Sequence, residues 1–358
     1  MRLLALNLPQ FHEIPENDEW WGKGFTEWNN VKGAKPLFEG HVQPMVPQEG
    51  YYDLSRREDV AHQCELARKF GLSGFIYYHY WFNGKMLLEK PCELLLDMPD
   101  VDVEYCFCWA NEPWARTWDG KPGNVLMPQT FGGEKDWEAH INYLEGFFKD
   151  PRYIKVGNQP VLYVYSPSSI PDFDSMVEYW NKHVKKIGFD GVYLVEFIST
   201  KNPDAFSEHS QAVMEFEPLY TTRFGISAVN KARRIIAKKT GNIDFQNFDA
   251  LWNDIINRKR TYGGRSIQKS GFSGWDNSPR KGRASMIVRG ATPEKFGAYL
   301  SKLLEQERAD ASNDFIVINA WNEWGEGAML EPTVQLGYRY LEAVKNALQS
   351  FVGKGDLA

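Results

Sequence analysis

The side chains best suited to chemistry gather in one short stretch, residues 319–332. It reads Asn-Ala-Trp-Asn-Glu-Trp-Gly-Glu-Gly-Ala-Met-Leu-Glu-Pro and follows the apolar run 315–318. Indoles offer flat stacking surfaces with a polar tip, and two carboxyl groups in one pocket can hold different protonation states. The stretch therefore predicts a site that grips and protonates a neutral, hydroxyl-rich ligand such as a sugar. The simpler alternative makes Trp321 and Trp324 core residues and the glutamates a solvated rim.

Other polar and aromatic clusters follow other apolar runs. A long loop after the first run holds Gln10 and Glu27, and further clusters occupy residues 77–83, 109–119 and 273–280. We expect these clusters to bind substrate through His12, Trp28, Tyr78, His79, Trp109, Asn111, Trp118, Asp119, Glu217, Trp275, Asp276, Trp321 and Asn322. Plain core packing is the alternative for His79 and for several of the tryptophans. No compact His, Asp and Glu spacing typical of metal ligands stands out, so no metal and no cofactor are expected.

Alternating strand and helix patterns must position these clusters. Strands are predicted at 3–8, 74–80, 104–109, 160–165, 192–197, 212–216, 267–272 and 315–320. Helices are predicted at 56–70, 89–97, 136–149, 175–187, 248–260, 293–308 and 337–350. Eight strands with intervening helices favour one (β/α)8 barrel over residues 1–358, whose active site lies at the carboxyl ends of the strands. A doubly wound sheet, the alternative, needs a Gly-rich first turn that residues 9–12 lack.

The less regular, more basic segment at about 219–265 is expected to be an elaborated loop or lid region beside the site.

Composition narrows the class of protein. A net charge of -6 and a pI near 5.8 argue against nucleic-acid binding, and the basic patches are read as solvated helix faces. Contact with an acidic polymer or a membrane surface is the alternative for those patches. The four cysteines show neither zinc nor redox spacing, which indicates buried thiols in a reducing compartment. No apolar run approaches the length of a membrane span, so a cytoplasmic protein is expected, with its oligomeric state open.

Several motifs together resemble a known family. They are Leu-Pro-Gln-Phe-His at 8–12, Trp-Trp-Gly-Lys-Gly-Phe-Thr-Glu-Trp at 20–28, Tyr-Tyr-His-Tyr-Trp-Phe at 77–82, Trp-Ala-Asn-Glu-Pro-Trp at 109–114, Trp-Asp-Asn-Ser-Pro at 275–279 and Asn-Glu-Trp-Gly-Glu-Gly at 322–327. With these motifs the chain resembles the bacterial WbsX-like family, named for glycosyltransferases of surface-polysaccharide loci. A narrower resemblance, centred on residues 322–327, is to glycoside hydrolase family ninety-nine, the endo-α-mannosidases.

The second resemblance implies a mechanism. Glu323 would deprotonate the substrate 2-hydroxyl, whose oxygen attacks the anomeric carbon to give a 1,2-anhydro sugar. Glu326 would protonate the leaving oxygen and then activate water, with net retention. Asn111 and Glu112 form a second Asn-Glu pair like the acid/base motifs of other barrel glycosidases, so Glu112 is a third catalytic candidate. Its alternative is a rim acid paired with Arg116.

Three functions stay open at this point. The first is an enzyme that cleaves an α-linked glycan of a bacterial surface polysaccharide. The second is a sugar-nucleotide-dependent glycosyltransferase, although the Asp-x-Asp string at 100–102 precedes a predicted strand instead of following one. The third is a glycan-binding protein without catalysis. In each case the expected partner is an oligosaccharide or polysaccharide.

Overall fold

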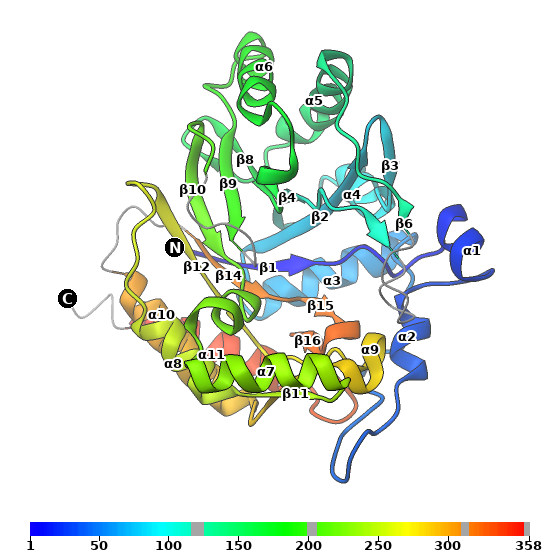
Figure 1. Cartoon of the computed structure of the whole chain (residues 1–358). Helices are drawn as coiled ribbons and strands as arrows, with labels where there is room; N and C mark the ends of the chain where they lie inside the picture. The colour runs from blue at the N-terminus through cyan, green and yellow to red at the C-terminus, as the bar shows by residue number, and fades with distance from the viewer. Residues whose placement is uncertain (116–124, 199–205, 309–314, 354–358) are drawn as a thin grey trace.

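Eight apolar runs of the sequence form parallel strands that close into a barrel (Figure 1). The structure is a computed structural model and describes residues 1–115, 125–198, 206–308 and 315–353. The barrel strands are β1 (Arg2–Asn7), β2 (Gly74–Phe82), β4 (Glu104–Trp109), β8 (Gln159–Val164), β9 (Tyr193–Ile198), β10 (Ser210–Glu215), β12 (Ser266–Phe272) and β14 (Phe315–Asn319). Because β1 pairs with both β2 and β14, the sheet has no open edge. The predicted (β/α)8 barrel is confirmed, and the doubly wound alternative is wrong.

The strands are buried on both faces, as parallel strands between an interior and a helical layer must be. All nine residues of β2 are buried, although they include three tyrosines and a histidine. At its first residue, Gly74, an added Cβ would lie 1.7 Å from the carbonyl oxygen of Glu104. Glycine is required there because the neighbouring strand approaches so closely.

The predicted helices cover the barrel. They are α3 (Arg57–Lys69), α4 (Lys90–Leu96), α5 (Glu134–Phe148), α6 (Phe173–Lys186), α8 (Phe248–Asn257), α10 (Pro293–Glu307) and α11 (Arg339–Gly353). In α3 the buried Val60, Cys64 and Ala67 recur at helical spacing and face the core. Helix α8 ends three residues earlier than predicted, because Arg258 leaves the helix and pairs with the buried carboxylates of Glu215 and Glu217.

Short elements that the sequence did not predict elaborate the loops. After β1 the chain forms α1 (Pro15–Trp21) and α2 (Glu27–Gly33). The remaining ones are β3 (Lys85–Leu87), β5 (Trp114–Ala115), β6 (Val125–Met127), β7 (Lys155–Val156), α9 (Ser278–Lys281), β13 (Met286–Arg289), β15 (Asn322–Glu323) and β16 (Ala328–Met329).

The segment 219–265 is more regular than its sequence suggested. It contains a π-turn (Thr221–Gly225), α7 (Ala228–Thr240), β11 (Asp244–Asn247) and α8, and β11 pairs with β13 in a small parallel sheet. Helix α7 escaped prediction although its apolar residues recur at helical spacing, because the segment was interpreted as a basic loop; its largest apolar side chains face solvent. A lid role for the segment, and a single catalytic domain over the whole chain, stay predictions.

All four cysteines are buried free thiols, as expected. In the described ranges no helix combines the length and apolar character needed to cross a membrane.

Candidate active site

The stretch 319–332 forms a tight structure directly after β14. Asn322 and Glu323 pair with Ala328 and Met329 as the β15–β16 hairpin, and one 3₁₀ turn (Trp324–Glu326) connects them. Asn322 fixes the hairpin to the first strand: its Nδ2 donates to the carbonyl of Leu8 at 3.0 Å, and its Oδ1 accepts from the Leu8 amide at 2.7 Å. The helix-like turn that would bring Glu323 and Glu326 to the same sugar is therefore present.

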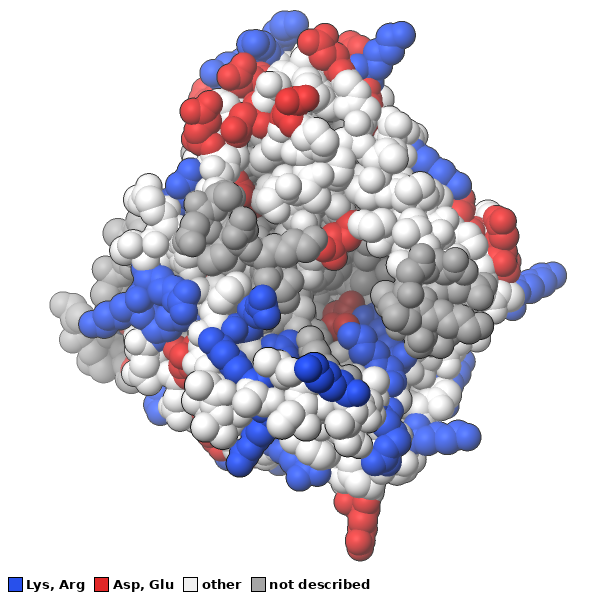
Figure 2. Space-filling model, viewed as in Figure 1, with Lys and Arg blue, Asp and Glu red and all other residues white. Residues whose placement is uncertain are grey.

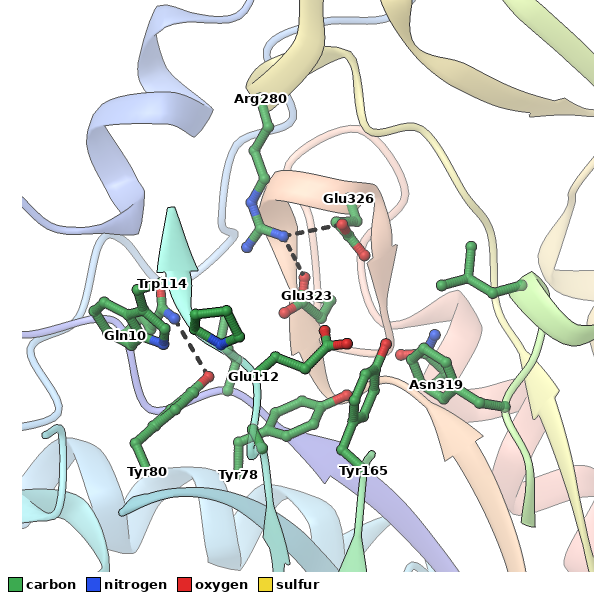
Figure 3. Close-up of a pocket in the computed structure, with 15 residues that line it drawn as sticks. Gln10, Tyr78, Tyr80, Glu112, Trp114, Tyr165, Arg280, Asn319, Glu323 and Glu326 are labelled. Atoms are coloured by element: carbon green, nitrogen blue, oxygen red, sulfur yellow. Dashed lines mark hydrogen bonds and ion pairs between the residues drawn. The ribbon is translucent and has the colours of Figure 1, made fainter. Parts of the chain in front are cut away.

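Both glutamates line a cavity of about 260 Å³ at the carboxyl ends of the strands. Figure 3 shows Tyr78, Tyr80, Tyr165 and Glu112 pointing into it from the barrel side, opposite Arg280. The other lining residues are Leu8, Gln10, Ala110, Pro113, Trp114, Phe216, Leu219 and Asn319. The cavity thus combines aromatic surface with three carboxyl groups, which is the composition expected for a sugar site.

A single buried guanidinium joins the acids. Arg280 Nη1 lies 3.2 Å from Glu323 Oε2 and 3.1 Å from Glu326 Oε1, and Arg280 Nε lies 2.8 Å from Glu27 Oε1. Burial alone would lower the pKa of Arg280, but the three carboxyl groups outweigh it and hold that pKa well above its ordinary value. One positive charge does not balance three carboxylates, of which Glu27 and Glu323 are buried, so the arrangement favours a proton on the cluster.

Electrostatics indicates where that proton resides. Burial raises the pKa of Glu323 to about 8, against the opposing effect of Arg280 and with further increases from Glu326 and Glu27. Burial also raises the pKa of Glu27, although Arg280 opposes it. A pKa raised toward neutrality lets the Glu323 carboxyl both take up and release a proton, which suits a group that exchanges protons with substrate.

Gly325 allows this cluster to assemble. A Cβ at this position would lie 1.9 Å from Glu27 Oε1 and 2.6 Å from Arg280 Nε. The ion pair between the loops after β1 and β12 therefore packs directly on the backbone of the turn, and any side chain at Gly325 would displace it.

Glu331, at the end of the same stretch, has a different role. Its carboxylate accepts hydrogen bonds from Trp324 Nε1 at 2.6 Å, Tyr52 hydroxyl at 2.9 Å and Gln63 Nε2 at 2.8 Å. Burial raises the pKa of Glu331 to about 7 despite these donors. With its oxygens occupied by protein donors and no place on the cavity wall, Glu331 supports the hairpin.

Asn319 carries an acceptor with no protein partner. Its Nδ2 donates to the carbonyl of Glu217 at 2.8 Å, which fixes the orientation of the amide. Its Oδ1 is buried, lines the cavity and has no hydrogen-bond partner. A buried carbonyl oxygen is costly to leave unpaired, so a hydroxyl donor of a bound ligand would stabilise it.

Of the predicted site residues, the structure brings Glu323, Glu326, Glu112 and Tyr78 to the cavity. Trp118 and Asp119, and Arg116 as the alternative partner of Glu112, lie outside the described residues. The other predicted ligand-binding residues do not line this cavity. They are His12, Trp28, His79, Trp109, Asn111, Glu217, Trp275, Asp276, Trp321 and Asn322.

The aromatic members of that group pack in the core. Trp109, Trp275 and Trp321 are each at most 3% exposed, and Trp28 packs between Phe11 and Trp324. An indole this deeply buried has no face left for a sugar, so the core alternative holds for these residues.

The polar members of the group bind protein groups. His79 Nε2 lies 2.9 Å from His140 Nε2, Glu217 pairs with Arg258 at 2.6 Å, and His12 Nδ1 lies 3.0 Å from the carbonyl of Pro9. Asn111 exchanges hydrogen bonds with the backbone of Ser166, and Asp276 Oδ2 lies 2.7 Å from both His41 and Gln43. These side chains position loops instead of substrate.

Sequence reasoning did not single out Arg280, Tyr80, Tyr165 and Trp114 as cavity residues, whereas Asn319 belongs to the stretch from which the site was predicted. One signal pointed to Arg280. A cluster of buried acids requires a counter-ion, and Arg280 closes the 273–280 stretch that follows a barrel strand.

One group in the described ranges has atoms close enough to share a metal ion. It is Glu178, Glu208 and His209, whose ligand atoms lie within 4.8 Å of one another at the surface. Exposed acidic clusters are common without a metal, and this group is not part of the cavity.

Known proteins resemble the chain at two levels. The family described as Glycosyltransferase WbsX matches residues 3–344. Two uncharacterised proteins named WxcX, from two strains of Xanthomonas campestris pv. campestris, are each 36% identical over 351 residues. The match covers 97% of this chain and 49% of theirs, so the chain spans about half the length of these curated relatives.

Two solved structures share the barrel. The endo-α-mannosidase of family ninety-nine from Bacteroides thetaiotaomicron has a TM-score of 0.59 at 14% identity, covering 99% of this chain and 98% of that one. A glycoside hydrolase-like protein has a TM-score of 0.61 at 14% identity, with coverages of 97% and 93%. At this identity the likeness shows the fold alone.

Proposed function

The chain belongs to the WbsX glycosyltransferase family, a carbohydrate-active family, and we propose that it breaks a glycosidic bond. The bond is an α-glycosidic one, and it is broken in the cavity that Arg280 lines. The substrate is an α-linked glycan of a bacterial surface polysaccharide. The observation that carries the proposal is the pair of carboxyl groups, Glu323 and Glu326, held by one guanidinium nitrogen in an aromatic cavity.

The separation of the two carboxyl groups is compatible with net retention. Their bound oxygens lie 3.2 and 3.1 Å from the same atom, so they are at most 6.3 Å apart, the sum of the two distances. Inverting glycosidases hold their carboxyl groups roughly 6.5–9.5 Å apart to leave room for a water molecule, and retaining ones hold them closer. We propose retention by way of the substrate 2-hydroxyl and a 1,2-anhydro sugar.

Each glutamate has one role in this scheme. Glu323 takes the proton of the 2-hydroxyl, and its raised pKa makes its carboxylate a stronger base for that step. Glu326 gives a proton to the leaving oxygen and then receives one from the water that opens the anhydro ring at the anomeric carbon, while Glu323 returns its proton to the 2-oxygen as that bond breaks. Glu112, on the opposite wall, and the Asn319 oxygen hold sugar hydroxyls. Four buried free thiols support a cytoplasmic location for the reaction.

Turnover of glycan tests the proposal. Wild type, Glu323→Gln and Glu326→Gln are incubated with bacterial surface polysaccharide and with α-mannan, and the products are read by mass spectrometry. We expect oligosaccharide release by wild type and losses of at least ~100-fold in both folded variants. If wild type binds glycan, cleaves none and extends none, the protein is a binding module and the proposal fails.

The pH profile of kcat/KM tests the assignment of roles. If Glu323 is the base, kcat/KM rises with pH as Glu323 ionises around pH 8. A profile that falls through the same range, and loses that limb in Glu323→Gln, would make Glu323 the acid instead.

The family description favours a second candidate, transfer from a nucleotide sugar. Among the described lining residues Arg280 is the sole cation, and three carboxyl groups surround it. A diphosphate placed there would meet like charge. Chain extension that requires an added nucleotide sugar, without hydrolysis, would establish the transferase instead.

A further inference from the structure

Helix α7 turns its apolar side toward solvent. Val229, Ile235 and Ile236 are 61%, 55% and 61% exposed. With Ala232 they recur at spacings of three, four and seven residues, so they share one face of the helix. Aliphatic side chains exposed together on one helical face indicate a surface that binds another protein or a membrane.

The opposite side of α7 faces the protein and is polar. Arg234 donates to the carbonyl of Thr222 and lies 3.4 Å from Asp244. The helix is also capped at both ends, by the Ser227 hydroxyl and by Gly241 in the left-handed conformation. The helix is therefore capped at both ends and held to the protein by polar contacts, so its apolar face is not needed for attachment to the barrel.

The charge around α7 is strongly positive. Residues 219–289 contain 15 Lys and Arg and 4 Asp and Glu, a net of +11. Because the whole chain carries -6, the remaining residues carry -17. Figure 2 shows the basic side chains gathered on the lower half of the face, over α7 and its neighbours, with acidic ones prominent near α5 and α6.

We propose that α7 binds the surface of an anionic lipid bilayer. Val229, Ile235 and Ile236 enter the headgroup region, and the exposed Lys231 and Arg233 contact lipid phosphates. A basic helix with an apolar face is the type of element that lies in a membrane interface without crossing it. The cavity opens on the same face (Figure 2), so the bound protein would meet glycans held at that membrane.

Two other occupants fit the observations less well. A second copy of the chain would bring a like-charged α7 against this one, which electrostatic repulsion opposes. A nucleic acid would match the charge, but aliphatic side chains neither neutralise phosphates nor stack on bases.

Sedimentation with lipid vesicles tests the proposal, and it does not depend on catalytic activity. The full chain is mixed with vesicles of phosphatidylcholine and phosphatidylglycerol, or of phosphatidylcholine alone. We expect binding to the anionic vesicles only, weaker at higher salt. Ile235→Ser with Ile236→Ser should weaken it by about tenfold or more, because it removes the inserted side chains.

Matched variants elsewhere on the surface serve as controls. Val352→Ser removes an equally exposed aliphatic side chain from α11. The α7 charge variant is Lys231→Glu with Arg233→Glu, and its control is Lys185→Glu with Lys186→Glu, which makes the same change of charge on α6. The controls should leave vesicle binding unchanged, and the α7 charge variant should abolish it.

Three results would overturn the proposal. They are absence of binding to anionic vesicles, equal losses in the control and α7 variants, and a dimer or a nucleic-acid complex that forms in place of vesicle binding and disappears in the isoleucine variant.

Discussion

Replacing Glu323 by Gln should make the protein more stable, and increasingly so as the pH rises. Burial raises the pKa of this carboxyl from 4.5 to about 8. A protonated Glu323 therefore contributes stability in full below pH 4.5, and that contribution is lost as the pH rises through 8. Glutamine keeps the shape of the protonated carboxyl and cannot ionise, so the variant keeps the stability that wild type loses as the pH rises.

The size of the effect follows from the shift. A change of 3.5 units, from 4.5 to about 8, at 1.36 kcal/mol per unit gives a ceiling of about 5 kcal/mol above pH 8. We expect ~3 kcal/mol, because the glutamine amide interacts less favourably with Arg280 than a carboxyl group does. For a chain of 358 residues, this corresponds to a rise in Tm of about 4 °C.

Thermal unfolding of wild type and Glu323→Gln between pH 5 and 9 measures this difference without any substrate. Glu331→Gln is the matched comparison, since it places the same amide in a buried position of the same stretch. There the amide group would face three hydrogen-bond donors, so this variant should be less stable at every pH. The exposed Glu39→Gln should change nothing.

One result would refute the reasoning. If Glu323→Gln is destabilised, or if its advantage does not grow with pH, the folded protein holds Glu323 ionised against Arg280. The proton of the cluster would then reside elsewhere.

Three further predictions concern the cavity and the helical layer. Arg280→Lys should lower kcat/KM at least ~10-fold while the protein stays folded, because an ammonium group cannot span the three carboxyl groups. Asn319→Ala should raise KM for glycan by ~10-fold because it removes the free acceptor in the cavity, and it should lower Tm because the carbonyl of Glu217 loses its donor. Burial lowers the pKa of His79 to about 3. Between pH 6.5 and 3 the unfolded chain binds a proton at this residue and the folded protein does not, so the free energy of unfolding decreases as the pH is lowered. His79→Gln should flatten that fall by up to ~3 kcal/mol at pH 4.5, as chemical denaturation at several pH values would show.

The barrel could be predicted because each of its strands carries its own signal. A parallel strand buried on both faces is a continuous apolar run, and the eight strands match the predicted ranges to within two residues at each end. The helices of the outer layer carry buried stripes that are equally local. Helix α7 carries an apolar stripe at helical spacing too, but the basic residues around it led to its interpretation as a loop, and the protein leaves that stripe exposed.

The site was harder to predict because its members belong to different loops. The local motif around Glu323 identified the acids, whereas their common partner, Arg280, is distant in sequence. Tryptophans and histidines were over-assigned to the ligand because residue type does not reveal direction. Trp109 and His79 follow or end strands as expected, but their side chains point into the helical layer, where they contact His140.

The contact of Gly325 with the Glu27–Arg280 pair determines how this barrel can be recombined. Glu27 comes from the loop after β1, Arg280 from the loop after β12 and Gly325 from the loop after β14, and they meet without room for one extra carbon atom. A chimera that receives one of these loops from a distant homologue would inherit either a steric clash or an unpaired buried charge. The three loops therefore form a single unit of exchange.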